Sequence, residues 1–352
     1  MKKIIHFLLM AGLLPLFLFS QLSYGLTRYA PSGGTYTMNL VSVNAQLSYT
    51  PIIGSDGDKY YSIAPANREG IEINQHTSQP SGLVYCMVNY LSGYYHPGLL
   101  PNEAYHRVFA YKPDAGITIK GLNAYKINSN TYFTLYSNNK ITQGWQRIFA
   151  PGCSNAELGP LDASHFVIHF PFEVRIYVKN IPVDGKIVIP KSMLAGYTRI
   201  FSDSGAPNIN VPSDKASIIL DLTSSVVSYP SNCSSNISNL NINHQTLNAY
   251  EFNSLETRTV SYKCYLDRSV RVKFALDYVT DSDPQKRVPL KSGKNTIYSD
   301  LTLYDADTNQ RGKTFETTID KVKNIQVESH ISGFDMTPGK YTGNAWIIAT
   351  FL

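Results

Sequence analysis

The chain has 352 residues, 16% of them charged, and a formal net charge of +5 at pH 7. This charge is too small for the strongly basic surface of a typical nucleic-acid-binding protein, so we expect no nucleic-acid partner. A chain of this length can form one or two domains, each with its own hydrophobic core.

The first 25 residues have the order of a secretory signal. Met1, Lys2 and Lys3 precede an apolar stretch at 4–19, and small or polar residues follow up to Gly25. The stretch is too short and wrongly flanked for a membrane-spanning helix. We predict a signal peptide at 1–25, whose removal takes two lysines and leaves 327 of the 352 residues with a net charge of +3.

An exported chain can form disulfides. Its four cysteines are Cys86, Cys153, Cys233 and Cys264, which allow three pairings. Proximity in the sequence favours Cys86 with Cys153 and Cys233 with Cys264, one bridge in each half of the chain. None of the cysteines has the C-x-x-C spacing of a metal or redox site.

Most of the chain has the pattern of β-structure. Apolar and polar residues alternate at 172–179 and again at 270–278, and turn pairs such as Asp184-Gly185 and Pro338-Gly339 separate such runs. A short polar and β-branched stretch at 222–230 predicts a domain boundary. The sequence therefore predicts an all-β fold of two β-sandwich domains, at 26–228 and 229–352, the second of immunoglobulin-like size.

The first predicted domain is rich in aromatic residues that could stack on a sugar. It holds 16 of the 25 tyrosines and one of the two tryptophans. A sugar site needs an aromatic face and planar hydrogen-bonding groups. The candidate ligand-binding residues are Trp145, Gln146, Arg147, Asn208, Asn210, Tyr94, Tyr95 and His96. Two alternatives stay open: Trp145 as a core residue near a disulfide, and Tyr94 to His96 as an exposed turn without a partner.

Neither metal binding nor catalysis has a clear sequence signal. His165 and His169 would lie about 13 Å apart on a strand, too far to share an ion. His96 and His106 could meet only through folding. We expect no metal and no other cofactor. Because H-E-x-x-H, G-x-S-x-G and glycine-rich phosphate-loop motifs are missing from the sequence, we also expect no enzymatic activity.

The last residues predict an apolar strand from Tyr341 to Leu352, with no charge after Lys340. Ala345, Ile347 and Ala349 alternate with residues that include Trp346 and Ile348, so both faces carry large apolar groups. We expect a central strand whose next neighbour is missing from this domain, and we infer that another polypeptide supplies it, because an unprotected apolar edge pairs with other chains.

The C-terminal pattern resembles the two-domain tip adhesins of Gram-negative chaperone-usher pili, and within them the PapG-like lectins of P pili. The resembling features are Cys233 and Cys264 about thirty residues apart and the ending from Pro338 to Gly343 before an apolar strand. The resemblance implies an incomplete immunoglobulin-like pilin domain that lacks its last strand, which a periplasmic chaperone and then the next pilus subunit insert. It also implies that Trp346, Ile348 and the Leu352 carboxylate contact the chaperone, and that an outer-membrane usher catalyses the exchange.

The N-terminal resemblance is spread over the Cys86 to Cys153 spacing, the run 144–147 and the segment 181–190. It implies an elongated lectin-like domain and a sugar-stacking role for Trp145. Where the P-pilus lectin has a basic pair, this chain has Asn208 and Asn210, so galabiose specificity is not carried over.

The resemblance as a whole implies a fimbrial adhesin that is exported through the periplasm to the pilus tip and attaches bacteria to a host glycan. Three alternatives stay open: a structural tip initiator, an adhesin for a protein receptor, and a secreted carbohydrate-active enzyme.

Overall fold

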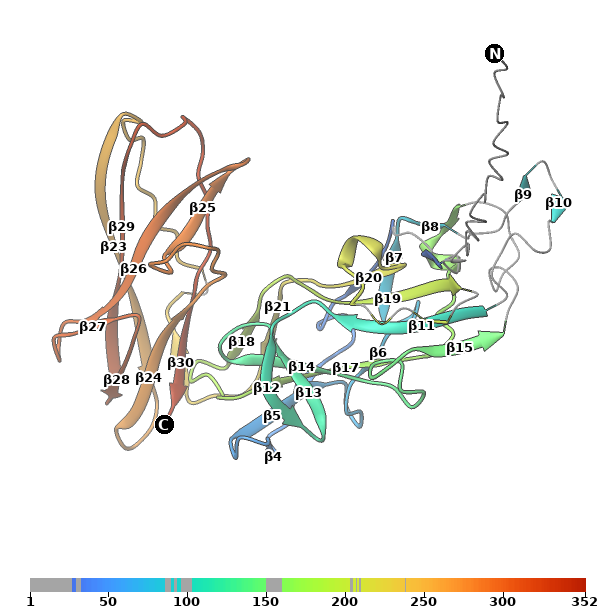
Figure 1. Ribbon diagram of the computed structural model, residues 1–352. Helices are drawn as coiled ribbons and strands as arrows, with labels where there is room; N and C mark the ends of the chain where they lie inside the picture. The colour runs from blue at the N-terminus through green and yellow to red at the C-terminus, as the bar shows by residue number, and fades with distance from the viewer. Residues whose placement is uncertain are drawn as a thin grey trace, which may run out of the picture.

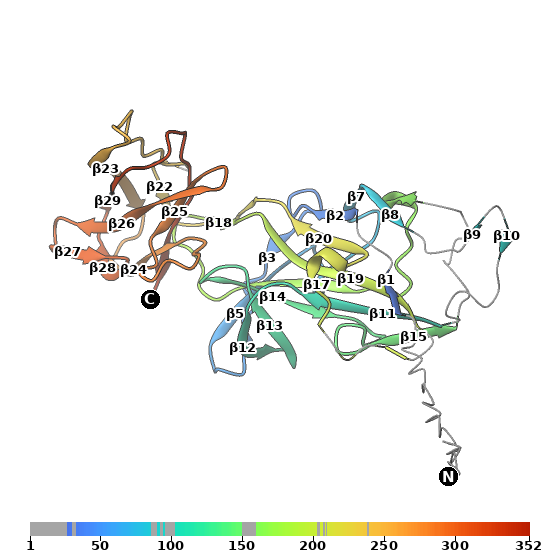
Figure 2. The ribbon, with the colours of Figure 1, turned by 45° about the horizontal axis from the view of Figure 1, so that its top comes forward.

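The computed structural model describes residues 27–29, 33–85, 90–91, 94–95, 103–149, 160–202, 205–206, 208, 210–237 and 239–352. The predicted signal peptide, Cys86, His96 and Cys153 lie outside these residues. Two groups of β-sheets, one before and one after residue 230, form the described chain (Figures 1 and 2). The all-β prediction is confirmed, and the only helices in the described residues are the 3-10 turns η1 (Ala163–His165) and η2 (Ser213–Lys215). None of the helices among these residues is long and apolar enough to cross a membrane.

Two large sheets pack face to face in the N-terminal group. The first has the order β15-β11-β19-β20-β2-β7, with β1 on β19. Its strands are β1 (Thr27–Tyr29), β2 (Gly34–Met38), β7 (Ser78–Ser81), β11 (Glu103–Ala110), β15 (Gln146–Phe149), β19 (Ser192–Ser202) and β20 (Ile218–Leu222).

The second sheet has the order β12-β13-β14-β17-β5-β3, with β4 on β5 and β6 on β17. Its strands are β3 (Gln46–Leu47), β4 (Ile52–Ile53), β5 (Lys59–Ala64), β6 (Ile71–Glu72), β12 (Asp114–Ile119), β13 (Leu122–Lys126), β14 (Thr131–Tyr136) and β17 (Glu173–Val178). Val108 and Tyr197 of the first sheet share one buried cluster with Phe133 and Ile176 of the second, so this cluster is the core between the sheets.

Three short ribbons complete the N-terminal group. They are β8 (Leu83–Tyr85) with β16 (Pro160–Asp162), β9 (Tyr90–Leu91) with β10 (Tyr94–Tyr95), and β18 (Lys186–Ile189) with β21 (Ser225–Ser228). In Figure 1 the β18–β21 ribbon lies on the side of the C-terminal strands.

The C-terminal group is a sandwich of a large and a small sheet. The large sheet has the order β22-β23-β29-β26-β25, with β27 on β26, and the small sheet has the order β28-β24-β30. The strands are β22 (Cys233–Ser235), β23 (Glu251–Cys264), β24 (Val270–Asp277), β25 (Val288–Ser292), β26 (Asn295–Asp305), β27 (Gln310–Gly312), β28 (Thr314–Ile319), β29 (Val322–Phe334) and β30 (Trp346–Phe351). Tyr262 and Ile325 of the large sheet pack with Phe274 and Ala349 of the small one.

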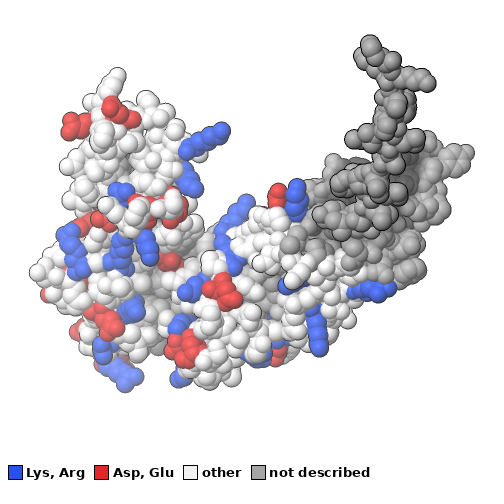
Figure 3. Space-filling model, viewed as in Figure 1, with Lys and Arg blue, Asp and Glu red and all other residues white. Residues whose placement is uncertain are grey.

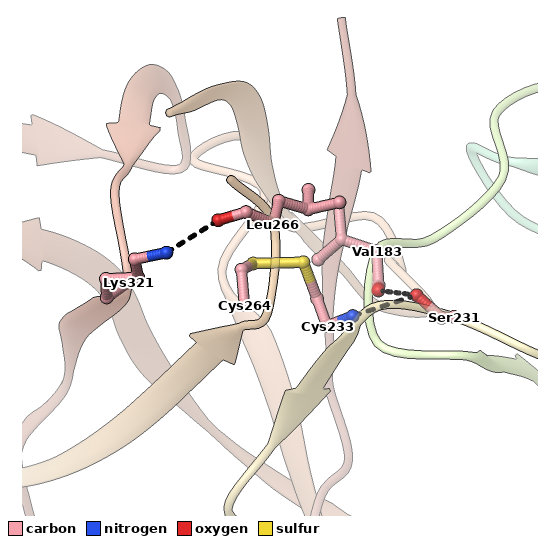
Figure 4. Close-up of a disulfide and its surroundings, with 6 residues drawn as sticks. All are labelled: Val183, Ser231, Cys233, Cys264, Leu266 and Lys321. Carbon is pink, nitrogen blue, oxygen red and sulfur yellow. Dashed lines mark hydrogen bonds between the residues drawn. A yellow bond between two sulfur atoms is a disulfide. The ribbon is translucent and has the colours of Figure 1, made fainter. Parts of the chain in front are cut away.

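The Cys233–Cys264 pairing is confirmed: this disulfide joins β22 to β23, where the two cysteines lie opposite one another (Figure 4). β21 ends at Ser228 and β22 begins at Cys233. The division of the chain at residue 228 stays a prediction.

The predicted final strand is too long at its N-terminal end. The structure has β30 only from Trp346, whereas Thr342 forms an isolated bridge with Lys291. The reason lies at Gly343, where a Cβ would come within 2.6 Å of the Pro289 carbonyl oxygen and of the Leu290 side chain. The chain therefore passes close against β25 before it enters β30, and this close approach requires glycine.

Candidate functional site

The outward face of β11 carries a row of aromatic and basic side chains. Successive strand residues point to opposite faces, so Val108 enters the core while Arg107 and Phe109 face away from it. Tyr111 follows the strand, and its hydroxyl donates to the Val211 carbonyl at 3.1 Å. We call Arg107, Phe109, Tyr111 and Trp145 the β11 outer face.

Trp145 packs against this face. Its ring centroid lies 5.6 Å from that of Phe109 at an interplanar angle of 70°, and the side chain is half-buried. The Arg107 guanidinium carbon lies 4.7 Å from the Phe109 ring centroid. The tryptophan therefore packs against the strand and keeps part of its surface accessible, and its contact with a ligand stays a prediction.

The neighbours of Trp145 point to opposite faces. Arg147 lies opposite Tyr105 and is exposed, on the side of Trp145, whereas Gln146 lies opposite the buried His106. The period of two in β15 places Gln146 on the opposite face of the strand from Trp145 and Arg147, and its predicted role in ligand binding stays a prediction. Arg107, which the sequence analysis did not name, also lies on the β11 outer face. The alternation of residues along β11 could have predicted this position.

Asn208 and Asn210 belong to the segment that connects β19 to η2, and both are exposed. The hydrogen bond from Tyr111 to Val211 holds the end of this segment beside the β11 outer face. Gly196, opposite Phe109 on β19, makes room there, since a Cβ would lie 2.6 Å from the Tyr111 ring. Asn210 therefore directly precedes a residue that is hydrogen-bonded to this face.

Tyr94 and Tyr95 form the short strand β10, which pairs with β9. The structure describes only the backbone of these two residues, so their predicted contact with a ligand stays a prediction. His96 lies outside the described residues.

Folding brings together two histidines whose pairing the sequence did not predict. The ring centroids of His106 and His169 lie 5.4 Å apart, and His106 Nδ1 lies 2.5 Å from the Tyr197 hydroxyl. Burial, helped by the nearby Arg199 charge, lowers the pKa of His106 to about 2 and that of His169 to about 4. Both rings are therefore neutral at pH 7. No group of three or more His, Cys, Asp or Glu side chains suited to a metal occurs among the described residues.

The second candidate site is the free edge of β30. Six residues of β30 pair with β24 on one side, from Trp346 opposite Asp277 to Phe351 opposite Val272. On the other side the structure places only an isolated bridge between Thr350 and Pro182 in the described chain. The strand expected to be central is thus an edge strand here, in a position that lacks a neighbour over Trp346 to Ile348.

The predicted chaperone contacts lie along this strand. Trp346 and Ile348 are half-buried, on the opposite face from the core residue Ala349, and Leu352 is exposed. Their contact with a chaperone stays a prediction.

The large sheet of this sandwich is buried unevenly along β23. In β23, Val260, Tyr262 and Cys264 are buried, but no residue from Glu251 to Thr259 is. On the paired strand β29, however, Ser329 and Ile331 are buried, and His244 Nε2 lies 2.8 Å from Ser329 Oγ, so the segment after β22 covers this part of the sheet. The feature that lacks a neighbour is therefore the edge of β30.

Residues 233–352 match the family model of the fimbrial adhesin MrpH C-terminal domain. The match covers the C-terminal sandwich, including β30, which is about a third of the chain, and shows that this part is similar to a fimbrial adhesin domain. The closer resemblance to PapG-like lectins stays a prediction, because the matching model describes a different adhesin. A search of curated proteins found no match.

Three solved tip-adhesin structures align with most of the chain at low identity. One is a chaperone–tip adhesin complex of CFA/I fimbriae, with 11% identity, 92% of this chain and 98% of that chain covered, and a TM-score of 0.24. The CsuC–CsuE pre-assembly complex of Acinetobacter baumannii Csu pili has 12% identity, 93% and 100% coverage, and a TM-score of 0.25. The CupB6 tip adhesin of Pseudomonas aeruginosa has 10% identity, with 92% of this chain and 94% of that chain covered, and a TM-score of 0.24. TM-scores of this size do not establish a shared fold. The family-model match is therefore the comparison on which we rely.

The buried His106 predicts an acid-sensitive stability. Its pKa is lower in the folded chain than the value near 6.5 of an unfolded histidine, so its contribution is complete above pH 6.5 and is lost as the pH falls toward 2. Between pH 7 and 5 we expect this group to lower the free energy of unfolding by about 2 kcal/mol. Chemical denaturation at both pH values measures the total loss, which His106→Gln should reduce by about this amount, while the loss from His169, whose pKa burial also lowers, should remain.

The matched control for this measurement is His165→Gln, which removes an exposed histidine from η1 and should keep the wild-type loss. An unchanged loss in His106→Gln would show that the buried ring is not its source.

Proposed function

We propose that this chain is a fimbrial tip adhesin of the chaperone-usher class. Its C-terminal sandwich accepts a strand from a periplasmic chaperone and then from the next pilus subunit at an outer-membrane usher. Its N-terminal sandwich binds a glycan on the surface of the host cell. The observation that carries the proposal is the free edge of β30, within the region that matches a fimbrial adhesin model.

Backbone geometry defines which groups of β30 would bind the added strand. The Ala349 carbonyl accepts a hydrogen bond from Val183, on the side away from β24. Residues two apart point their N–H and C=O groups the same way, so Ile347 also presents its groups to the free edge, whereas those of Ile348 point to β24. An added strand therefore needs the Ile347 N–H.

A proline at this position tests strand acceptance. Ile347→Pro removes the N–H and places its ring against the incoming strand, while the hydrogen bonds to β24 remain. We expect capture by the chaperone of the same fimbrial system, co-expressed in a bacterial periplasm, to fall at least tenfold, the effect of about 1.4 kcal/mol.

Ile347→Ala is the matched control, since it removes the side chain and keeps the N–H. Equal capture of the proline and alanine variants would contradict strand addition at this edge.

The β11 outer face supports the glycan-binding part of the proposal. An aromatic ring can stack on the apolar side of a pyranose, and arginine and asparagine groups can bind its hydroxyls. Trp145 offers a partly accessible ring, with Arg107 and Arg147 on the same face and exposed asparagines on the connecting segment. On the face shown in Figure 3, basic and acidic side chains are interspersed.

A glycan array with the full chain in its chaperone complex tests this site. We expect selective binding that falls about tenfold in Trp145→Ala, because loss of one stacked aromatic ring costs about 1.4 kcal/mol. Tyr49→Ala removes an exposed aromatic ring elsewhere on the chain and should bind as the wild type does.

Binding that survives in Trp145→Ala would move the site, and no binding to any glycan would favour a protein receptor or a structural tip initiator.

A further inference from the structure

A short segment between β17 and β18 belongs to the C-terminal core although it comes from the N-terminal group. Val183 is 0% exposed and shares a buried cluster with Cys233, Phe274 and Ala349. Its backbone N–H donates to the Ala349 carbonyl at 2.8 Å. The segment from Pro182 to Asp184, which we call the junction segment, thus lies against the free edge of β30.

Residues before and within β22 hold the junction segment from its other side. The Ser231 hydroxyl donates to the Val183 carbonyl and accepts a hydrogen bond from the Cys233 N–H at 3.2 Å (Figure 4). The Tyr229 hydroxyl donates to the Pro182 carbonyl. The Ser235 hydroxyl donates to Asp184 at 3.2 Å. None of these three partners belongs to β30, so the segment is fixed independently of that strand.

The junction segment occupies one end of the position where an added strand would lie. Pro182 is the bridge partner of Thr350, and the hydrogen bond from Val183 to Ala349 makes this a non-hydrogen-bonded antiparallel pair. In such a pair the N–H of residue 182 points away from β30, which is a place that proline tolerates. Trp346 to Ile348 are left without a neighbour on this edge.

We propose that two parts of the chain form the strand-accepting site together. One is the free edge of β30, and the other is Pro182 and Val183, which stay in place and close one end of that edge. This inference rests on the proposed function. The occupant is an extended segment of another polypeptide that pairs with Trp346 to Ile348 and ends against Pro182. The junction segment stays in place, because its removal would expose Val183 and leave a buried carbonyl without its Ser231 partner. The N-terminal group therefore limits the length of the strand that the C-terminal sandwich accepts.

A cross-link that locks the junction segment tests the proposal. Cβ atoms of non-hydrogen-bonded antiparallel partners are close enough for a disulfide, so P182C/T350C should form one in the folded full chain. Mass spectrometry under non-reducing conditions verifies the bond and the native Cys233–Cys264 pair. The chaperone of the same fimbrial system, co-expressed in the periplasm, is the probe, and the amount of captured chain is measured.

We expect the locked chain to be captured within twofold of the wild type. The control V188C/V226C places a second cross-link between facing, exposed residues of β18 and β21, away from the β30 edge, and should also be captured.

Capture that is lost in P182C/T350C, kept in the control and restored by reduction would overturn the proposal, because the incoming strand would then have to displace Pro182 and Val183. Failure of the cross-link to form would overturn it as well. Loss of capture for the uncross-linked wild type is a different result: it would contradict strand acceptance itself, and with it the proposed function.

Discussion

The backbone groups on the free edge of β30 are the constraint on which the C-terminal half of the molecule depends. Buried N–H and C=O groups need partners, and a sheet edge finds them in water or in another strand. Here the Ala349 carbonyl accepts a hydrogen bond from the Val183 N–H of the junction segment, while Ile347 has no strand beside it in the described chain. One added strand would give these backbone groups their partners.

The two halves of the chain share one structural element at this point. Val183 is as deeply buried in the C-terminal core as Phe274, although it lies about fifty residues before Cys233. A cut at residue 228 would remove this side chain from the C-terminal sandwich and leave a cavity beside the disulfide. Assembly at the C-terminal end and the position of the N-terminal sandwich are therefore physically linked through Pro182 and Val183.

The sequence predicted features that depend on local patterns. The alternation at 270–278 became β24, and the spacing of Cys233 and Cys264 became the disulfide between β22 and β23. The alternation near Trp145 also contained the information that Gln146 faces away from it. Contacts between residues far apart in the sequence could not be predicted. His106 contacts His169, which lies 63 residues later in the chain. Val183 packs in a core whose other members all follow residue 230. No pattern within either segment encodes such a partner.

Residue-resolved hydrogen exchange of the Ile347 amide tests the account most directly. It is measured in the full chain alone and in its complex with the chaperone of the same fimbrial system. The account predicts rapid exchange in the free chain and slowing by about a hundredfold or more in the complex, while the Val183 amide stays protected in both. An Ile347 amide that is already protected in the free chain, or that gains no protection in the complex, would contradict strand addition at β30.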